Sequence, residues 1–432
     1  MHRPVLSLLA LTTLLALGAG ACATHKQPPK PPVVQHTGTM DLTPGITINA
    51  LVETRPGFIP VAGQRPLWLR GGKEIALTGT IQGRTEVLGF SGVGLKTSRL
   101  IAADGGPGAP HGKIVGLAAS PDGMTLAVAE AEPGRIEIVL RYVISNGGQN
   151  SVASFDGNFH AVSLNWLAPN TLAVTVVGDP AAAPPANGGL YLLHVAGAVT
   201  VEQVKLSCPV SLLSFSADAR YAAGHGDERT PPSLFDSRNG HCRRIASEGP
   251  IRVLGWGSRA LLYSTPGGGG QSPGVYLYDL LSGQTNLIAA SSSAAAFTRT
   301  DAVMALGSLD INPANIQPDQ RVTAQIASFI PGQATKVVNS LGIPTTPAML
   351  MASTLSYSQG FGELALELYA SRPEGPTREI VTFSVLGRKA FLLAHGPARG
   401  EALIAWWPGT NHLVIFDGDG VTGALAIVTP ER

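Results

Sequence analysis

The stretch "SPDGMTLAVAE" (Ser120–Glu130) joins a tight turn to the start of a β-strand. Ser120, Pro121, Asp122 and Gly123 occupy the four positions of a type I turn in the order that such turns favour, with the fixed φ of proline in second place. The following "TLAVAE" is apolar and half-alternating, which is typical of a strand. A related phrase returns along the chain, and this recurrence decides the predicted fold.

Eight segments share the arrangement, in which an apolar or aromatic anchor residue precedes a turn and a short apolar strand. The anchors are Leu69, Ala119, Trp166, Phe215, Trp256, Phe297, Tyr357 and Trp407. Successive anchors lie 50, 47, 49, 41, 41, 60 and 50 residues apart. Repeats of about 40 to 50 residues are typical of β-propellers built from four-stranded blades.

The segments between anchors supply the other strands of each unit. "RIEIVLRYVI" and "NSVASF" follow the second anchor, and "GVYLYDL" and "QTNLIAA" follow the fifth. A lone four-stranded sheet cannot cover both of its faces, so we expect the units to stack radially with apolar residues between them. The recurring aromatic anchors are therefore interpreted as packing between blades rather than as a carbohydrate-stacking track.

The two ends of the repeat region predict how the ring closes. After Trp407 the last unit has too few strands, whereas "ITINALVE" (Ile46–Glu53) is a strand-like run before the first unit. The predicted fold class is all-β, a β-propeller with eight four-stranded blades most favoured, closed by this N-terminal strand. Seven blades is the alternative, because the stretch 297–357 is irregular and contains "INPANIQPDQ" as an insertion.

The turn phrase resembles the repeats of TolB-type and related WD-like propellers, in which a serine-proline-aspartate-glycine turn precedes an apolar strand. Ser120 to Gly123 match that pattern strictly, whereas "SADARYAA" and "APNTLAV" match it in part. The resemblance covers the architecture of most of residues 46–432. It implies no particular function, because propellers include enzymes, receptors and scaffolds.

The N-terminus "MHRPVLSLLALTTLLALGAGAC" has the order of a secretory signal: His2 and Arg3, a mostly apolar run, small residues and Cys22. Residues 19–22 resemble the lipobox of bacterial lipoproteins, with Ala19 in place of the usual leucine. The resemblance implies cleavage before Cys22 and acylation of its thiol and its new amino group. A plain signal peptide and an uncleaved helix are the alternatives.

Three regions follow from this interpretation: a signal peptide (1–21), a lipid-anchored proline-rich linker (22–44) and the propeller domain (45–432). The linker includes "ATHKQPPKPPVVQHTG", whose prolines favour extended polyproline II geometry. We expect the protein to be exported and attached to a bacterial membrane through Cys22, on either the periplasmic or the cell-surface side.

Composition supports a large core and excludes one class of partner. The chain has 432 residues, of which 44% are hydrophobic and 14% charged. Its 30 basic and 29 acidic residues give a net charge of +1, so nucleic acid is not an expected partner. No nucleophile elbow, zinc-protease motif, phosphate loop or calcium loop is present, and no cofactor or catalytic residue is predicted. "DGDG" (Asp417–Gly420) is interpreted as a polar hairpin turn.

Four histidines form the candidate ligand or metal face. His111, His160 and His395 are placed in the connections that lead from one blade to the next, and His225 follows the second strand of its blade with Asp227 nearby. Both kinds of loop emerge on the same propeller face. Imidazole and carboxylate there suit Zn²⁺ or general acid–base chemistry, although polar loop residues spread around a wide rim are the favoured interpretation.

Cys208 and Cys242 are the other cysteines, and export would allow a disulfide between them. A bridge over 34 positions would stabilise the fold by about 3 to 4 kcal/mol in the loop-entropy model. The predicted register places Cys208 on one face of the propeller and Cys242 on the other, which argues against the bond. The pairing is left open.

The favoured function is an envelope-anchored scaffold that binds an envelope protein or another ligand, with the face of the interblade loops as its working surface. A small ligand or a glycan is an alternative partner. The alternative function is a hydrolase or lyase that acts on an envelope or extracellular polymer through the histidine face. A third alternative, a structural subunit of an envelope complex, predicts an exposed apolar patch on the outer strands.

Overall fold

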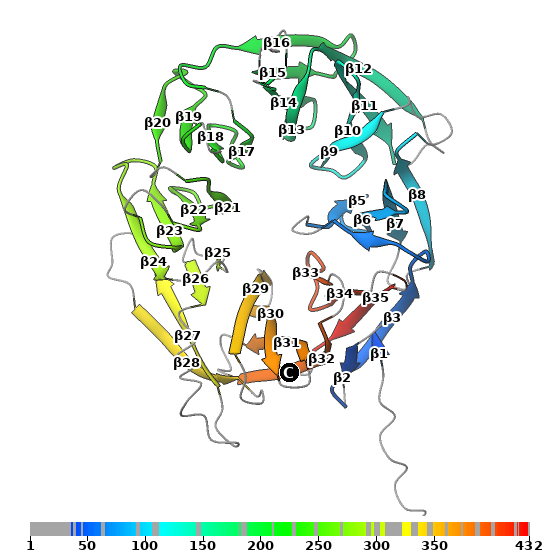
Figure 1. Cartoon of the computed structure of the whole chain (residues 1–432), viewed down its shortest axis with the longest axis vertical. Coiled ribbons are helices and arrows are strands. Elements are labelled where there is room, and N and C mark those ends of the chain that lie inside the picture. Colours follow the sequence, from blue (N-terminus) through cyan, green and yellow to red (C-terminus); the bar gives the residue numbers. More distant parts are fainter. Residues whose placement is uncertain are drawn as a thin grey trace, which may run out of the picture. The chain divides into compact units, whose positions relative to one another are not determined.

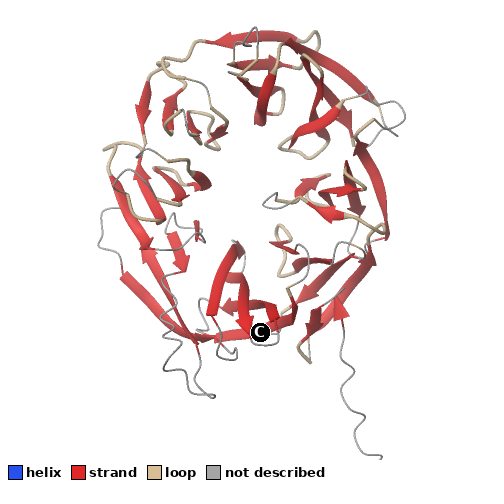
Figure 2. Cartoon of the chain, viewed as in Figure 1, coloured by secondary structure: helices blue, strands red, loops and turns tan. Residues whose placement is uncertain are grey.

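All regular structure that the computed structural model describes is β-strand (Figures 1 and 2). The described residues are 36–37, 40–44, 46–61, 65–91, 96–105, 112–143, 148–179, 181–182, 188–209, 211–226, 230–245, 249–267, 271–290, 295–297, 303–306, 322–329, 336–343, 349–358, 362–372, 375–384, 389–398, 402–418, 421 and 423–430. They belong to the second of two compact units, 1–34 and 35–432. None of the described residues forms a membrane-spanning apolar helix. Cys22, His111, Asp227 and the insertion "INPANIQPDQ" lie outside the described residues.

The strands pair into eight separate sheets, numbered here along the chain by their inner strands. Sheet 1 contains β4 (Ile59–Pro60), β5 (Leu67–Leu69), β6 (Glu74–Ile81), β7 (Arg84–Ser91) and β8 (Lys96–Ala103). Sheet 2 contains β9 (Lys113–Ala119), β10 (Thr125–Glu132), β11 (Arg135–Tyr142) and β12 (Gln149–Asp156). Sheet 3 contains β13 (Phe159–Ala168), β14 (Thr171–Gly178), β15 (Gly189–His194) and β16 (Thr200–Val204). Sheet 4 contains β17 (Leu213–Phe215), β18 (Tyr221–Gly224), β19 (Ser233–Asp236) and β20 (Cys242–Arg244).

The other four sheets complete the ring in Figure 1. Sheet 5 contains β21 (Arg252–Trp256), β22 (Ala260–Thr265), β23 (Gly274–Asp279) and β24 (Thr285–Ala290). Sheet 6 contains β25 (Ala295–Phe297), β26 (Val303–Leu306), β27 (Val322–Phe329) and β28 (Lys336–Ile343). Sheet 7 contains β29 (Met349–Ser358), β30 (Glu363–Arg372), β31 (Gly375–Ser384) and β32 (Lys389–Pro397), extended by β2 (Met40–Leu42) and β1 (His36–Thr37). Sheet 8 contains β33 (Ala402–Trp406), β34 (Leu413–Gly418), β35 (Gly423–Thr429) and β3 (Thr47–Glu53).

The chain is therefore an all-β propeller built from four-stranded sheets, as the spacing of the anchors predicted. Every anchor lies in an inner strand or one residue after it, and the next strand of the sheet follows the turn. In Figure 1 the inner strands β5, β9, β13, β17, β21, β25, β29 and β33 surround the centre of the ring. Apolar side chains pack between adjacent sheets, as the cluster shared by sheets 2 and 3 shows.

The turn at Ser120 has the predicted geometry and joins two sheets. The Gly123 N–H donates to the Ser120 carbonyl at 2.7 Å, and the Ser120 hydroxyl donates to Asp122 Oδ1 at 2.5 Å. The Arg70 N–H, in the equivalent turn of sheet 1, donates to the Gly123 carbonyl at 2.8 Å. Gly123 has φ +67°, and a Cβ there would lie 2.7 Å from the Arg70 nitrogen. Only glycine fits this junction.

Aromatic residues of the inner strands join neighbouring sheets, as the sequence indicated. Trp166 Nε1 of sheet 3 donates to the Ala118 carbonyl of sheet 2 at 3.1 Å. Trp406 Nε1 of sheet 8 donates to the Ser356 carbonyl of sheet 7 at 3.1 Å. The residue that makes this contact in sheet 8 is thus Trp406 rather than the anchor Trp407, whose ring instead packs edge-on against Trp68 of sheet 1, with ring centroids 5.2 Å apart.

The N-terminal segment contributes to two neighbouring sheets. The strand expected to supply the outer edge of the last unit, β3, pairs antiparallel with β35, with Thr47 opposite Thr429 and Glu53 opposite Ala424. β2 pairs with β32 of sheet 7, with Asp41 opposite His395. The predicted linker ended at residue 44, but Met40 is fully buried within that range. The described part of the linker is therefore folded into the sheet, because its apolar side chains fill the space beside β32.

A buried ionic network lies where sheets 7 and 8 meet. Arg378 Nε lies 2.9 Å from Glu367 Oε1, and Arg378 Nη1 lies 3.8 Å from Asp417 Oδ1. The Met40 N–H donates to Asp417 Oδ2 at 2.8 Å. Asp417 has no exposed surface and belongs to β34. The interpretation of "DGDG" as a polar hairpin turn is therefore wrong for Asp417, which accepts hydrogen bonds within the core instead of facing water.

Candidate functional site

The described histidines of the predicted face lie on three different sheets. His160 belongs to inner strand β13 of sheet 3, where a β-bulge interrupts the register, and its Nδ1 is 3.0 Å from the Gly178 carbonyl. His395 belongs to β32 of sheet 7, between Glu379 and Asp41 on the flanking strands. The prediction placed both in connections between blades and is wrong on this point, because β13 and β32 extend further than the apolar pattern indicated.

His225 lies where the sequence placed it, directly after β18. Its N–H donates to the Leu212 carbonyl at 3.0 Å, and its carbonyl accepts the Ile251 N–H at 2.7 Å. Burial lowers the pKa of the imidazole below its usual value, so the ring is neutral near pH 7. Through Ile251 this loop of sheet 4 fixes the start of β21 in sheet 5.

Within the described part of the chain, no three His, Cys, Asp or Glu side chains come together as a metal site. His111 and Asp227 lie outside that part, so the full predicted set is not placed. The three described histidines make their contacts with backbone groups or within their own sheets. Among the described residues, the histidines of the predicted face therefore do not come together at one site.

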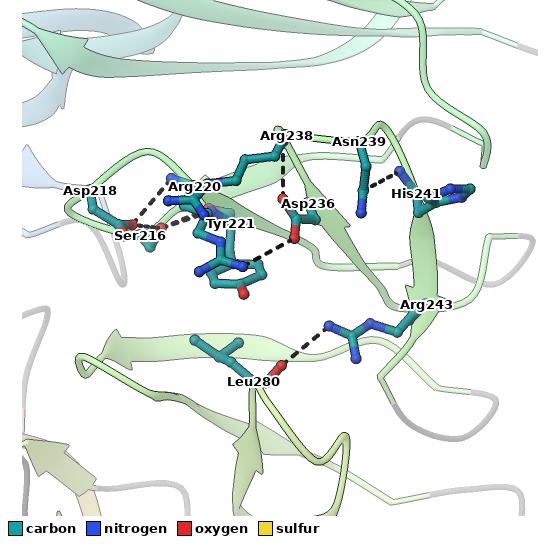
Figure 3. A network of polar contacts seen from close by, with 10 residues as sticks. All are labelled: Ser216, Asp218, Arg220, Tyr221, Asp236, Arg238, Asn239, His241, Arg243 and Leu280. Atoms are coloured by element: carbon teal, nitrogen blue, oxygen red, sulfur yellow. Dashed lines mark hydrogen bonds and ion pairs between the residues drawn. The ribbon is translucent and has the colours of Figure 1, made fainter.

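The turns of sheet 4 form a second polar region, shown in Figure 3. The Ser216 hydroxyl donates to Asp218 Oδ1 at 2.6 Å and accepts the Tyr221 N–H at 3.0 Å. This repeats the Ser120–Asp122 contact of sheet 2. The Arg220 guanidinium lies over the Tyr221 ring, 4.7 Å from its centroid, and 3.7 Å from Asp236 Oδ2. The first turn of the sheet is therefore held by its own side chains.

The second turn, between β19 and β20, carries exposed basic side chains. Asp236 Oδ1 accepts the Arg238 N–H, and Asn239 Oδ1 accepts the His241 N–H, both at 3.0 Å. Arg243 Nη2 donates to the Leu280 carbonyl of sheet 5 at 3.2 Å. Arg238, His241 and Arg243 are all exposed, and together they are called the cationic turn. These short side-chain caps fix the backbone of the turn (Figure 3).

A disulfide ties this turn to the preceding sheet. Cys208 Sγ and Cys242 Sγ are 2.00 Å apart, with the Cα atoms 5.8 Å apart. Ser207 Oγ donates to the Gly240 carbonyl at 2.9 Å and accepts the Cys242 N–H at 3.1 Å. Both cysteines lie in the elements that the sequence assigned, but the inference that they lie on opposite faces is wrong. The contacts of Ser207 and Cys208 show that the connection after β16 reaches the turn before β20.

A third polar feature lies at the centre of the ring. Arg65, between β4 and β5 of sheet 1, donates from Nη2 to the Leu254 carbonyl of β21 in sheet 5, at 3.0 Å. Burial lowers the pKa of the Arg65 guanidinium, and the positive charge of Arg252 lowers it further. Nothing in the sequence near residue 65 or 254 indicates that these two segments meet. The cationic turn was also missed, although "SRNGHCRR" shows its basic character.

Comparisons with known proteins show the fold. No protein-family model matches the chain, and no curated protein matches it in sequence. Sqt1 from Chaetomium thermophilum, solved bound to the N-terminus of ribosomal protein L10, is similar over 89% of this chain and 99% of its own, with 12% identity and a TM-score of 0.51. A prolyl endopeptidase structure is similar over 84% of this chain and 55% of its own, with 14% identity and a TM-score of 0.50.

TolB from Acinetobacter baumannii is also similar, over 75% of this chain and 63% of its own, with 14% identity and a TM-score of 0.34. That score is too low for the likeness to carry an argument. At these identities the structural neighbours establish a propeller fold and nothing about activity.

Proposed function

We propose that this chain is an exported, lipid-anchored propeller that acts as a scaffold and binds a partner protein through the cationic turn. In this proposal the eight sheets are the blades of one ring closed by β3, and Cys22 carries the lipid. The partner presents an acidic surface to Arg238, His241 and Arg243. The protein resides in the cell envelope of a bacterium.

One observation carries the proposal: three exposed basic side chains on a turn whose backbone is fixed. The disulfide, the Asp236 and Asn239 caps and the bond from Arg243 to sheet 5 all restrain this turn. Binding to a restrained surface loses little conformational entropy, so more of the interaction energy appears as affinity. Arginine is enriched at protein interfaces, and complementary charge accelerates association.

The place where the chain enters the propeller favours the same surface. β1 and β2 lie beside sheet 7, across the ring from sheets 3 and 4 (Figure 1). The 13 residues between Cys22 and His36 would span about 40 Å as polyproline II. A ring anchored at sheet 7 would leave sheet 4 free to meet a partner. The Sqt1 structure shows that a propeller of similar fold binds the end of a ribosomal protein, which supports protein binding as a use of this architecture.

The two alternative functions have weaker support. Catalysis by a hydrolase or lyase would rest on the histidine face, whose described members lie on three sheets. A structural subunit was expected to show an apolar patch on its outer strands. Exposed apolar residues do occur there, but Leu51, Leu100, Val201 and Leu287 lie on the outer strands of four different sheets. Scattered single residues of this kind are ordinary surface.

The test is capture from intact cells after brief cross-linking, with a C-terminal tag. Arg238→Glu combined with His241→Glu reverses the charge of the cationic turn without removing the Arg243 bond. Lys73→Glu is the matched control, because Lys73 is an exposed cation in a turn of sheet 1. We expect the first variant to lose at least about tenfold of the captured partner, and Lys73→Glu to retain it.

Cys22→Ser separates anchoring from binding. Loss of the partner from this variant in cells, with binding kept in the purified proteins, supports a scaffold that depends on its anchor. Equal capture by the charge-reversed variant and the wild type would contradict the proposed surface. Recovery of envelope glycan without a protein partner would favour the ligand-binding or enzymatic alternatives.

A further inference from the structure

Arg65 reaches the strand that carries a second arginine, Arg252, from a distant part of the chain. Arg65 belongs to sheet 1, and its Nη2 reaches the Leu254 carbonyl of sheet 5 at 3.0 Å, across 189 positions of sequence. In Figure 1 these two sheets lie on opposite sides of the ring. Arg65 therefore crosses the centre, where its guanidinium meets the inner strand β21.

The Leu254 carbonyl can accept this bond because it lies on the unpaired edge of its sheet. β21 pairs with β22 alone, so its other edge faces the centre of the ring. The pairing shifts between Val253 and Gly255, which leaves Leu254 as the extra residue of a β-bulge. Bulges redirect the groups of a strand locally. The bond from Ile251 to His225 fixes the same strand one residue before Arg252.

Arg252 supplies the second positive charge. It lies two residues before Leu254 on β21, and both Arg252 and Arg65 are exposed. Burial lowers the pKa of Arg65, and the positive charge of Arg252 lowers it further. Arg65 and Arg252 have no carboxylate partner among the described residues. Five other described arginines do pair with glutamates: Arg55 with Glu86, Arg99 with Glu74, Arg135 with Glu137, Arg141 with Glu130 and Arg378 with Glu367.

Two like charges at exposed positions repel each other weakly through water, and an anion bound between them would replace that repulsion with attraction. A guanidinium presents five N–H donors in a plane, which matches the oxygens of a phosphate or a carboxylate. The bond from Arg65 Nη2 to the Leu254 carbonyl uses one of these five donors. Because Arg65 is bonded to the strand that carries Arg252, the two guanidinium groups could share one oxyanion.

We propose that Arg65 and Arg252 bind a small-molecule oxyanion, a phosphate or a carboxylate, at the centre of the ring. This site is independent of the cationic turn and of the proposed scaffold function. The ligand would join sheets 1 and 5, which no strand pairing connects. Its binding would therefore stabilise the ring as well as occupy it.

Calorimetry of the purified full chain in dilute Tris chloride tests the proposal, with inorganic phosphate, citrate or sodium chloride added at equal ionic strength. We expect phosphate or citrate to raise the melting temperature of the wild type beyond the effect of chloride, since a ligand that binds the folded state stabilises it. Arg252→Gln should abolish that additional rise. Isothermal titration should show binding weakened at least about tenfold.

The melting temperature of Arg252→Gln without added anion separates a binding role of Arg252 from a merely structural one. Without added phosphate or citrate, Arg252→Gln should melt at a higher temperature than the wild type, because the repulsion from Arg65 is removed. Arg84→Gln is the control, since Arg84 is an exposed arginine bonded to the Asp104 carbonyl at the edge of sheet 1. Arg84→Gln should keep the full response to phosphate or citrate.

Arg65→Gln also removes the bond to Leu254 and can destabilise the fold, so Arg65→Lys, which keeps the charge, accompanies it. Arg65→Lys should keep part of the anion response, whereas Arg65→Gln should lose it. A response to phosphate but not citrate, or the reverse, assigns the class of oxyanion. The proposal is overturned if neither anion stabilises the wild type more than chloride does, or if Arg252→Gln responds as the wild type does.

Discussion

The junction of sheets 7 and 8 and the cationic turn of sheet 4 use charge in opposite ways. At the junction, Arg378 is fully buried and lies 2.9 Å from Glu367, with Asp417 and the Met40 N–H completing the network. In sheet 4 the strands have only three or four residues, and Arg238 and His241 face water. The junction joins segments from both ends of the chain, whereas sheet 4 is local in sequence and is tied by a disulfide.

This difference indicates which charges maintain the fold and which are free to bind. A buried charge is very costly unless it is paired, so the paired charges at the junction serve to maintain the fold. An exposed charge contributes little to stability and can be satisfied by a partner. A disulfide at the start of β20 ties the cationic turn to the connection that precedes sheet 4.

The largest expected loss of stability follows from a change at the junction of sheets 7 and 8. Arg378→Met leaves Glu367 and Asp417 buried without their cation, and we expect a loss of about 3 to 5 kcal/mol in the free energy of unfolding. Arg55→Met is the control, because Arg55 forms a half-exposed pair with Glu86 at 3.4 Å and should cost less than about 1 kcal/mol. Urea titrations of both variants measure the difference. Similar losses in the two variants would contradict the assignment of the buried network to stability.

Loss of the disulfide is expected to reduce the free energy of unfolding almost as much, and its effect should be on sheet 4. Replacing Cys208 and Cys242 with alanine opens a loop of 34 positions and should cost about 3 to 4 kcal/mol in the loop-entropy model. Dithiothreitol should lower the stability of the wild type by a similar amount and leave the double variant unchanged. If reduction changes neither unfolding nor partner capture, the covalent tie is not what holds the cationic turn.

The smallest expected effect is in the first turn of sheet 4. Ser216→Ala removes the bonds to Asp218 and Tyr221 and should cost about 1 kcal/mol. The Ser216 hydroxyl lowers the pKa of Asp218 below its usual value. The stability that ionised Asp218 supplies is therefore present above the usual aspartate pKa and is lost as the pH falls through the lowered value.

The corresponding pH experiment uses Asp218→Asn. This variant should be less stable than the wild type near neutral pH, and the two should converge in acid as the wild-type carboxylate becomes protonated. Asp122→Asn in sheet 2 provides the matched comparison, because the Ser120 hydroxyl lowers the pKa of Asp122 in the same way. A difference between variant and wild type that does not change with pH would show that the ionised carboxylate has no such role.

The sequence predicted those features that depend on local spacing. The anchor repeat located the inner strands, and the missing strand of the last unit identified Ile46–Glu53, of which β3 forms the greater part. The type I turn at Ser120 followed from four consecutive residues. These features are readable because each one is specified within a single repeat or by a simple count of strands.

Other features depend on how distant segments meet after the sheets twist and assemble. The register assigned Cys208 and Cys242 to the right elements, but it gave no sign that the connection after β16 reaches the turn before β20. The glycines near Asp417 indicated a surface turn, but Asp417 is buried and accepts a hydrogen bond from the Met40 N–H, 377 positions away in sequence. Arg65 gives no local signal at all, since its partner strand lies in sheet 5.

Site-specific cross-linking in intact cells tests the central claim most directly. A photoreactive amino acid is placed at position 238 in the cationic turn or, as the control, at position 73 in the turn of sheet 1. The account predicts a discrete cross-linked protein from position 238 and none from position 73, with the product lost when His241→Glu is added. The same products from both positions, or none from position 238, would contradict a scaffold that binds its partner through the cationic turn.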